Sequence, residues 1–232
     1  MTIIPYQDYL DGTAKVLQES QTETERYEVE VLGREFIVNP GVFSPKYFED
    51  TAFFAAEVPK LVKPKDDFLE IGSGTGIVLV HTALSGVNKG IGIDISHGAY
   101  LNTLANIRKH GLQKKVTVRH GDLYDPLSAD EKFDVIFWNT PFGFVDRYNL
   151  TVFEKAVFDP GYQATERYII QGRNHLKPYG RLLIGFSTTL GRFDLLQKFL
   201  QQSDFTVRLA AKTASMETHP VFFELFEATP LT

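Results

Sequence analysis

The 232-residue sequence contains no cysteine, which excludes disulfide bonds, thiolate metal ligands and cysteine nucleophiles. It has no apolar run near the roughly 18 residues needed to cross a bilayer. Its amino terminus lacks the basic start and apolar core of a signal peptide. The 24 lysines and arginines are outnumbered by 29 acidic residues, and this net charge of −5 argues against a large nonspecific nucleic-acid surface. We therefore expect a cytoplasmic protein without a membrane-spanning segment.

The sequence does contain enough apolar material for one packed domain. Hydrophobic residues make up 43% of the chain, and 19 of them are phenylalanines. A chain of this length fits one α/β domain with a small extension. Its six histidines show neither the spacing of metal ligands nor a nucleophile partner, so we expect no metal site.

Short apolar runs alternate with helical stretches over the later part of the chain. Strands are predicted at 67–71, 90–95, 115–119, 133–138, 181–187, 204–211 and 221–228. Helices are predicted at 76–85, 97–110, 160–176 and 191–202. Such alternation is typical of a mostly parallel sheet with helices on both faces. Because no helix separates the last two strands, one of them is expected to be antiparallel.

The earlier part of the chain carries different patterns. Residues 1–30 are polar and predict a helix or an arm, whereas the alternation over 26–38 predicts a hairpin. Residues 48–61 have their apolar positions on one helical face. We therefore predict two parts, an amino-terminal arm with a hairpin and a main domain, at residues 1–45 and 46–232.

Four of the predicted strands end in residues that can bind a ligand. The first is Phe68–Gly76, Phe-Leu-Glu-Ile-Gly-Ser-Gly-Thr-Gly, in which three glycines let the backbone turn sharply and approach a ligand. The others end in Asp94, Gly121-Asp122 and Asn139-Thr140-Pro141-Phe142. A dinucleotide-binding turn would have its third glycine where this chain has Ile77. The turn therefore departs from the dinucleotide pattern. The acid at Asp94 can bind ribose hydroxyls in a dinucleotide-binding fold and equally in other nucleotide-binding folds.

Taken in order, these strand ends resemble those of the class I S-adenosylmethionine-dependent methyltransferases. The resemblance implies an α/β fold with a seven-stranded, mostly parallel, Rossmann-like sheet, helices on both faces and a reversed last strand. It also implies S-adenosylmethionine as the cofactor. The residues implied to hold its methionine, ribose and adenine parts are Glu70, Gly72, Ser73, Gly74, Gly76, Asp94, Ile95, Asp122 and Leu123.

The fourth strand end resembles Asn/Asp-Pro-Pro-Tyr/Phe/Trp, a motif of the branch that methylates planar amino groups. The resemblance implies four catalytic residues. The Asn139 oxygen and the Thr140 carbonyl would accept N–H groups of the acceptor. Pro141 would stiffen the loop, and Phe142 would stack on the planar group. The chain departs from the motif at Thr140, where a proline is expected, so the loop lacks one rigid ring.

A segment before the first core strand carries a further resemblance. Pro40-Gly-Val-Phe-Ser44, followed by Asp50-Thr51, is similar to a segment of small-domain amino-methyltransferases that act on ribosomal RNA bases. Release-factor glutamine methyltransferases have a related segment. Because this segment covers the cofactor in both groups, the resemblance implies a lid in which Phe43 and Thr51 contact S-adenosylmethionine.

These resemblances imply an S-adenosylmethionine-dependent N-methyltransferase that acts on a planar amino group of a macromolecule. A nucleobase in RNA is the favoured acceptor, and a glutamine side chain in a protein is the alternative. A hypothesis from another class is a catalytically weak S-adenosylmethionine-binding scaffold. The departure at Thr140 favours that hypothesis, and the intact Asn139 and Phe142 oppose it. The sequence leaves the oligomeric state open.

Overall fold

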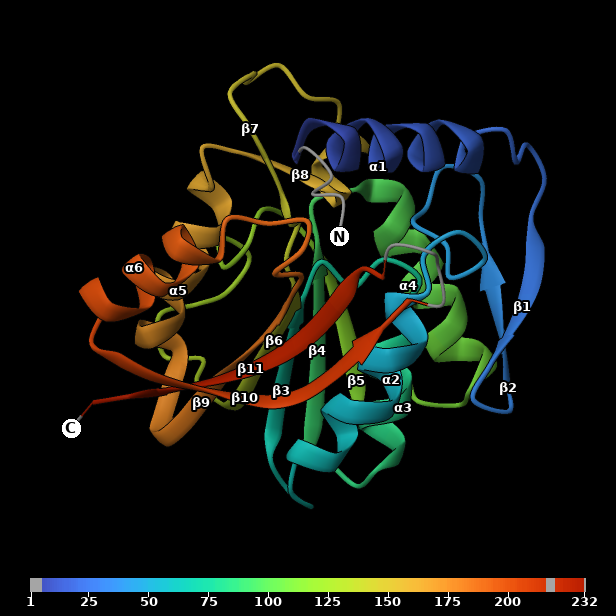
Figure 1. The fold of residues 1–232 in the computed structure, drawn as a ribbon. Coiled ribbons are helices and arrows are strands. Elements are labelled where there is room, and N and C mark those ends of the chain that lie inside the picture. The colour runs from blue at the N-terminus through green and yellow to red at the C-terminus, as the bar shows by residue number, and fades with distance from the viewer. Residues whose placement is uncertain (1–5, 216–219, 232) are drawn as a thin grey trace.

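The computed structural model describes residues 6–215 and 220–231, so residues 1–5 of the predicted amino-terminal arm lie outside it. The central strands are β3 (Asp67–Ile71), β4 (Lys89–Asp94), β5 (Val116–His120), β6 (Phe133–Asn139), β9 (Leu176–Phe186), β10 (Phe205–Ala214) and β11 (Phe222–Pro230). They form one seven-stranded sheet in the order β10-β11-β9-β6-β3-β4-β5 (Figure 1).

The pairing of these strands confirms the predicted sheet. The pairs from β9 through β6, β3 and β4 to β5 are all parallel. In contrast, β11 runs antiparallel to both β9 and β10. The last strand of the chain is therefore the reversed one. β3 lies between β4 and β6, so the strand order changes direction there, and this is where open α/β sheets bind ligands.

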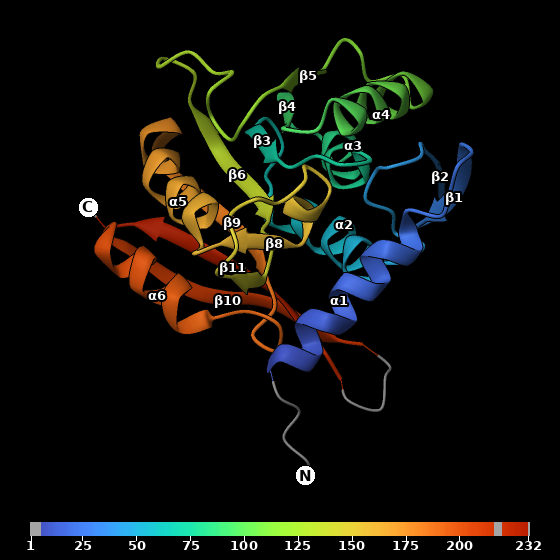
Figure 2. The ribbon, with the colours of Figure 1, turned by 90° about the horizontal axis from the view of Figure 1, so that it is seen from above.

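Helices cover both faces of the sheet because the strands present apolar residues to each. α2 (Asp50–Leu61), α3 (Ile77–Leu84) and α4 (His97–Lys109) pack on one face, together with Phe68 and Phe137. α5 (Gln163–His175) and α6 (Phe193–Gln202) pack on the other face, with Leu69 and Trp138. Figure 2 shows these two groups of helices on opposite sides of the strands. Burial on both faces explains why the core strands read as near-continuous apolar runs.

The amino-terminal region forms a helix and the predicted hairpin. α1 (Tyr6–Ser20) is followed by β1 (Tyr27–Val31) and β2 (Arg34–Val38), which pair antiparallel. The hairpin packs against α4, because the side-chain amides of Asn102 and Asn106 both donate to the carbonyl of Ile37 in β2. The hairpin is thus attached to the same face of the molecule as α2 and α3.

A segment between β6 and α5 contains two short strands that the sequence did not predict. β7 (Gly143–Val145) and β8 (Phe158–Pro160) pair in parallel, and a 3-10 turn, η1 (Glu154–Ala156), precedes β8. Strands of three residues are too short for an alternation pattern to reveal. α1 packs on this segment, with Leu17 in one apolar cluster with Val157 and Phe158. Figure 1 shows α1, β7 and β8 together at the top of the molecule.

Several predicted boundaries differ from the observed ones, and the differences at the starts of α5 and β9 have a visible cause. α5 begins at Gln163 and not at residue 160, because the carboxylate of Asp159 accepts the N–H groups of Ala164 and Thr165 in its first turn. β9 begins at Leu176 and not at residue 181, because the chain pairs with β6 as soon as α5 ends. Both differences reflect contacts between segments that a local pattern does not contain.

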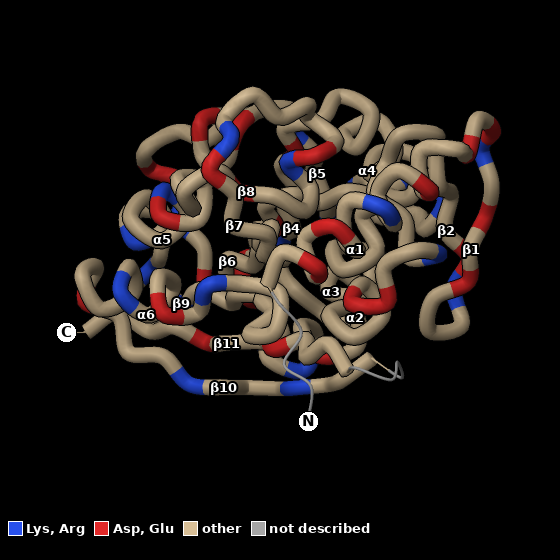
Figure 3. The backbone as a smooth tube through the Cα atoms, turned by 45° about the horizontal axis from the view of Figure 1, so that its top comes forward, with Lys and Arg blue, Asp and Glu red and all other residues tan. Residues whose placement is uncertain are grey.

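Charged residues of both signs are interspersed over the outside of the molecule (Figure 3). Many pair with one another, as Arg119 does with Glu131 and Arg208 with Glu227. Acidic and basic residues both occur in α1 and in the segment from β7 to β8. Within residues 6–215 and 220–231, no helix is both long enough and apolar enough to span a bilayer.

Candidate functional site

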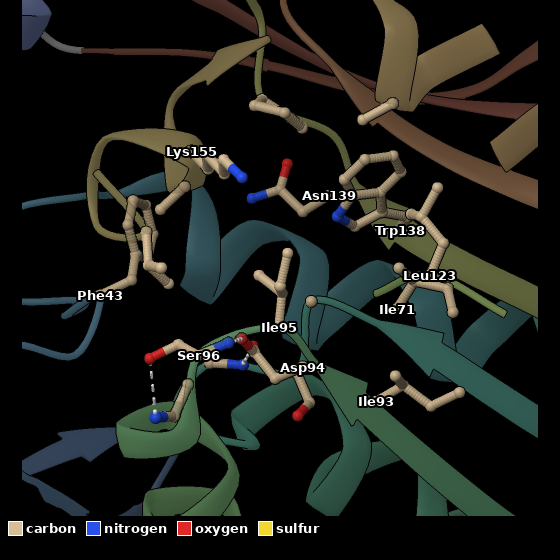
Figure 4. A pocket seen from close by; sticks show the side chains of 18 of the residues that line it. Phe43, Ile71, Ile93, Asp94, Ile95, Ser96, Leu123, Trp138, Asn139 and Lys155 are labelled. Carbon is tan, nitrogen blue, oxygen red and sulfur yellow. Dashed lines mark hydrogen bonds between the residues drawn. The ribbon is translucent and has the colours of Figure 1, made fainter. Parts of the chain in front are cut away.

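A cavity of about 520 Å³ opens at the carboxyl ends of β3, β4 and β6, where the strand order changes direction (Figure 4). Its wall contains most of the residues that the sequence singled out: Phe43, Thr51, Glu70, Gly72, Ser73, Gly74, Asp94, Ile95, Asp122, Leu123, Asn139 and Pro141. Gly76, Thr140 and Phe142 lie outside this wall. Residues far apart in the chain thus converge on one cavity.

The glycine turn after β3 is shaped by close packing. Gly72 and Gly74 have φ angles of 63° and 55°, in the left-handed region that favours glycine. A Cβ at Gly72 would lie 2.7 Å from the indole nitrogen of Trp138. Trp138, in the neighbouring strand β6, therefore leaves room for no side chain at Gly72 and holds the turn in place.

Asp94, at the end of β4, holds the same turn by hydrogen bonds. Its carboxylate accepts the N–H of Gly74 and the N–H of Ser96, each at 2.8 Å. Burial raises the pKa of Asp94, and these two bonds oppose the rise. Each carboxylate oxygen still has a further lone pair. The group therefore has acceptor capacity left for ribose hydroxyls, the role that the sequence predicts for it.

Glu70, in β3, is a buried carboxyl group that the protein alone does not satisfy. Burial raises the pKa of Glu70 well above its usual range, and the negative charge of Asp94 adds to the rise. Its Oε2 atom has no hydrogen-bond partner among the described residues. A buried oxygen without a donor is unfavourable unless a ligand provides one. The ammonium group of a methionine moiety provides a donor and a positive charge, so this wall fits S-adenosylmethionine.

Asp122, after β5, is paired with a residue that the sequence did not single out. The guanidinium of Arg167, in α5, donates to its carboxylate at 2.7 Å, and both residues line the cavity. An adenine amino group would therefore share Asp122 with Arg167. The contact between Asp122 and adenine stays a prediction.

Asn139 is the last residue of β6, and its side-chain amide is held from α2. The Nδ2 atom donates to Asp50 Oδ2 at 2.7 Å. The Oδ1 atom is buried, and no donor in the described part of the chain reaches it. Burial raises the pKa of Asp50 to about 6, although the bond from Asn139 opposes that rise. The site therefore contains an amide whose nitrogen is bound to a carboxyl group and whose oxygen lacks a donor.

Thr140 is buried and bonds to the adjacent strand β9. Its N–H and its hydroxyl both donate to the carbonyl of Gly185, at 3.1 and 2.7 Å. Through these two hydrogen bonds, β9 restrains Thr140, the residue that follows Asn139. A proline ring would restrain the same position by covalent geometry. The departure from the family motif at Thr140 is thus compensated within this chain.

Thr140→Pro is expected to lower the free energy of unfolding by about 1–3 kcal/mol, because proline has neither the N–H nor the hydroxyl that bonds to Gly185. Thr140→Val keeps the N–H and is expected to cost about 0.5–1.5 kcal/mol. Urea unfolding of the two variants measures the difference. Equal stability of Thr140→Pro and the parent protein would show that these bonds do not support the loop.

Phe142 packs into an aromatic cluster away from the cavity. Its ring centroid lies 6.1 Å from that of Phe186 and 6.2 Å from that of Phe223. The hydroxyl of Tyr162 also donates to the carbonyl of Phe142. The Phe142 ring is partly buried in this cluster and is not among the residues that line the cavity, and its role in stacking stays a prediction.

Sequence reasoning missed several side chains at the site, among them Asp50, Lys155 and Arg167. Asp50 was noted as part of the lid segment without a role of its own. Lys155 and Arg167 lie in segments without a motif, although both line the cavity. Figure 4 shows Lys155 and Asn139 facing one another across the cavity. The available signal was topological, since the segment that joins β6 to α5 must cross the carboxyl edge of the sheet.

Known proteins resemble this chain in sequence and in fold. The family model of the methyltransferase small domain matches residues 33–213. A provisionally assigned protein N5-glutamine methyltransferase of Methanocaldococcus jannaschii is 28% identical over 191 residues, which cover 79% of this chain and 91% of that protein. A release factor glutamine methyltransferase of Nitratidesulfovibrio vulgaris is 25% identical over 174 residues, which cover 71% of this chain and 59% of that protein.

A solved structure shares the fold at lower sequence identity. It is a 16S rRNA N2 methyltransferase of T. thermophilus, in complex with AdoMet and guanosine. It aligns with a TM-score of 0.61 and 18% identity, over 89% of this chain and 50% of that one. The likeness therefore concerns the fold.

Proposed function

Because this chain belongs to the methyltransferase small-domain family and is a class I S-adenosylmethionine-dependent methyltransferase, we propose that it methylates the side-chain amide nitrogen of a glutamine in a protein. The family and the cofactor are the premise, and the acceptor is the proposal. Two of the similar proteins carry names that specify glutamine methylation, which supports this acceptor.

The observation that carries the proposal is Asn139, which lines the cavity and whose buried Oδ1 atom has no hydrogen-bond donor among the described residues. This buried oxygen needs a donor that the described residues do not supply. An acceptor with an N–H group, such as a glutamine amide, supplies one when it enters the cavity. Asn139 would then hold the nitrogen that becomes methylated.

The main requirement of the reaction is that the methyl group of the cofactor and the nitrogen of the acceptor are correctly placed. S-Adenosylmethionine supplies a methyl group on a positively charged sulfur, already activated for transfer. Glu70 and Asp94 would bind the ammonium and the ribose of that cofactor. An amide nitrogen is a poor nucleophile because its lone pair is delocalised. A hydrogen bond from the N–H group of the acceptor to Asn139 Oδ1 favours a pyramidal nitrogen and the positive charge that develops on it. The fixed positions of cofactor and acceptor supply much of the remaining rate.

The placement of Phe142 favours a glutamine over the nucleobase that the sequence favoured. A base needs an aromatic face to stack on, and the Phe142 ring packs against Phe186 and Phe223 instead. The net charge of −5 and the mixed surface also suit a protein acceptor better than RNA. A glutamine side chain is narrow and needs no stacking surface.

A nucleobase amino group is the second candidate, and Tyr148 is the observation that favours it. This tyrosine lines the cavity, yet 62% of its surface is exposed. An exposed aromatic ring at the edge of the cavity is a surface on which a base can stack. It would take over the role that the sequence assigns to Phe142.

Labelled methyl transfer from S-adenosylmethionine into a cell extract tests the acceptor class. After incubation with the purified protein, the extract is separated into protein, RNA and small molecules. We expect the label in the protein fraction, resistant to ribonuclease and removed by protease. Label in the RNA fraction would replace the glutamine proposal by the nucleobase one.

A further inference from the structure

We propose that Asp50 is a positioning residue for methyl transfer, and that its carboxylate decides which edge of the Asn139 amide meets the acceptor. This inference rests on the proposed function, because it assumes that Asn139 binds the acceptor nitrogen. Asp50 lies 89 residues before Asn139 and outside the motif that follows β6. It starts helix α2.

The register between α2 and β6 brings the two side chains together. Phe54, one helical turn after Asp50, packs with its ring centroid 5.7 Å from that of Phe137. Phe137 is two residues before Asn139 and therefore points to the same face of the sheet. This buried aromatic contact fixes the helix against the strand, so Asp50 meets Asn139 in a defined position.

The chemistry of the pair allows one orientation of the amide. An ionised carboxylate accepts hydrogen bonds and donates none, whereas an amide has a donor end and an acceptor end. Asp50 therefore selects the nitrogen of Asn139, at 2.7 Å, and turns Oδ1 away from itself. Oδ1 lies beside Gly185, where an added Cβ would come within 2.8 Å of it. The amide is thus confined on one side and oriented from the other.

Burying a carboxylate destabilises the fold more than burying a neutral side chain that could hold the same amide. The use of a carboxylate at this position therefore points to a role beyond folding. Asp50 is buried, and burial raises its pKa to about 6. The charge of Glu49 adds to the rise, whereas the bonds from Asn139 and from the N–H of Thr51 oppose it. A neutral asparagine would fill the same space without the burial penalty. It could also donate to Oδ1, so it would not force the observed orientation.

Asp50→Asn is therefore expected to separate activity from stability. At pH 8 the rate of labelled methyl transfer into the fraction of the extract that the parent protein labels should fall about tenfold or more. The dissociation constant of S-adenosylhomocysteine, the cofactor without its methyl group, is measured by calorimetry and should stay within about twofold of the parent value. The thermal midpoint of unfolding should not fall. A residue that only supports the fold would show the opposite, a lower midpoint with normal transfer per folded molecule.

The pH dependence of stability gives an independent reading of the same variant. The pKa of Asp50 is about 6 in the folded protein against a usual 3.8. The folded state therefore binds this proton more tightly, and ionised Asp50 destabilises the fold as the pH rises. Relative to the parent, Asp50→Asn should gain thermal stability between about pH 4 and pH 6 and keep that gain above it. Glu49→Gln, which alters an exposed neighbour without a bond to Asn139, serves as the matched control and should leave the transfer rate unchanged.

The side-chain 15N–H signals of Asn139, assigned by comparison with Asn139→Ala, test the contact without any acceptor. We expect these signals to shift between pH 8 and pH 5 in the parent protein and not in Asp50→Asn. A parent-like transfer rate in Asp50→Asn would overturn the inference. It would also be overturned if the Asn139 signals shifted neither with the pH nor with the substitution. Label that moves to RNA, or to no fraction, would instead count against the glutamine proposal, and the Asn139 signals would still report on Asp50.

Discussion

Asn139→Ala is expected to reduce methyl transfer by about 10²–10³-fold while S-adenosylmethionine binding stays nearly unchanged. The substitution removes the buried Oδ1 atom that lacks a donor in the described residues, and with it the bond proposed for the acceptor nitrogen. The cofactor would bind on the other side of the cavity, at Glu70 and Asp94. Single-turnover rates at saturating cofactor measure the transfer step, and calorimetry measures the binding.

Asn174→Ala is the matched control for that variant. Asn174 is an exposed residue in α5, and its loss removes the same side chain from a place away from the cavity. It should retain the parent rate. Full transfer by Asn139→Ala would show that the reaction does not use this amide, and the amino-group mechanism would then be wrong.

Asp94→Ala is expected to weaken S-adenosylmethionine binding by about 30- to 1,000-fold, which corresponds to about 2–4 kcal/mol. Two effects contribute. The variant removes the acceptor proposed for the ribose hydroxyls, and it leaves the N–H groups of Gly74 and Ser96 without the carboxylate that now binds them. The glycine turn should therefore lose order before the cofactor arrives. Calorimetry well below the thermal midpoint measures the change.

Asp130→Ala provides a control that removes an exposed acid from the turn before β6. Its affinity for the cofactor should equal that of the parent protein. An unchanged affinity in Asp94→Ala would contradict the placement of the ribose at the end of β4. Tight NAD binding without S-adenosylmethionine binding would contradict the account as a whole.

The sequence predicted the parts of the fold that local patterns encode. Apart from Glu70, the run Phe68–Ile71 is apolar because β3 is buried on both faces, and its glycine turn needs the positive φ angles found at Gly72 and Gly74. The seven-stranded, mostly parallel sheet and its reversed last strand followed from the family resemblance and from the missing helix between β10 and β11. Most of the residues that line the cavity could also be predicted from local patterns, because they lie directly at strand ends.

The missed features depend on contacts between distant segments. The bond between Asp50 and Asn139 requires the register of α2 on β6, which no spacing in the sequence specifies. Phe142 turns into a cluster with Phe223, a residue 81 positions later whose neighbourhood is set by the reversed strand β11. The strands β7 and β8 have three residues each and carry no periodicity.

Identification of the methylated atom shows whether Asn139 binds the planar nitrogen of the acceptor that becomes methylated. Protein from an extract treated with the purified enzyme and S-adenosylmethionine is digested and analysed by tandem mass spectrometry. We expect the added mass of one methyl group on a glutamine side-chain nitrogen, present with the parent protein and absent with Asn139→Ala. A methyl group on a carbon, an oxygen or a lysine nitrogen, or one that persists with Asn139→Ala, would contradict this expectation.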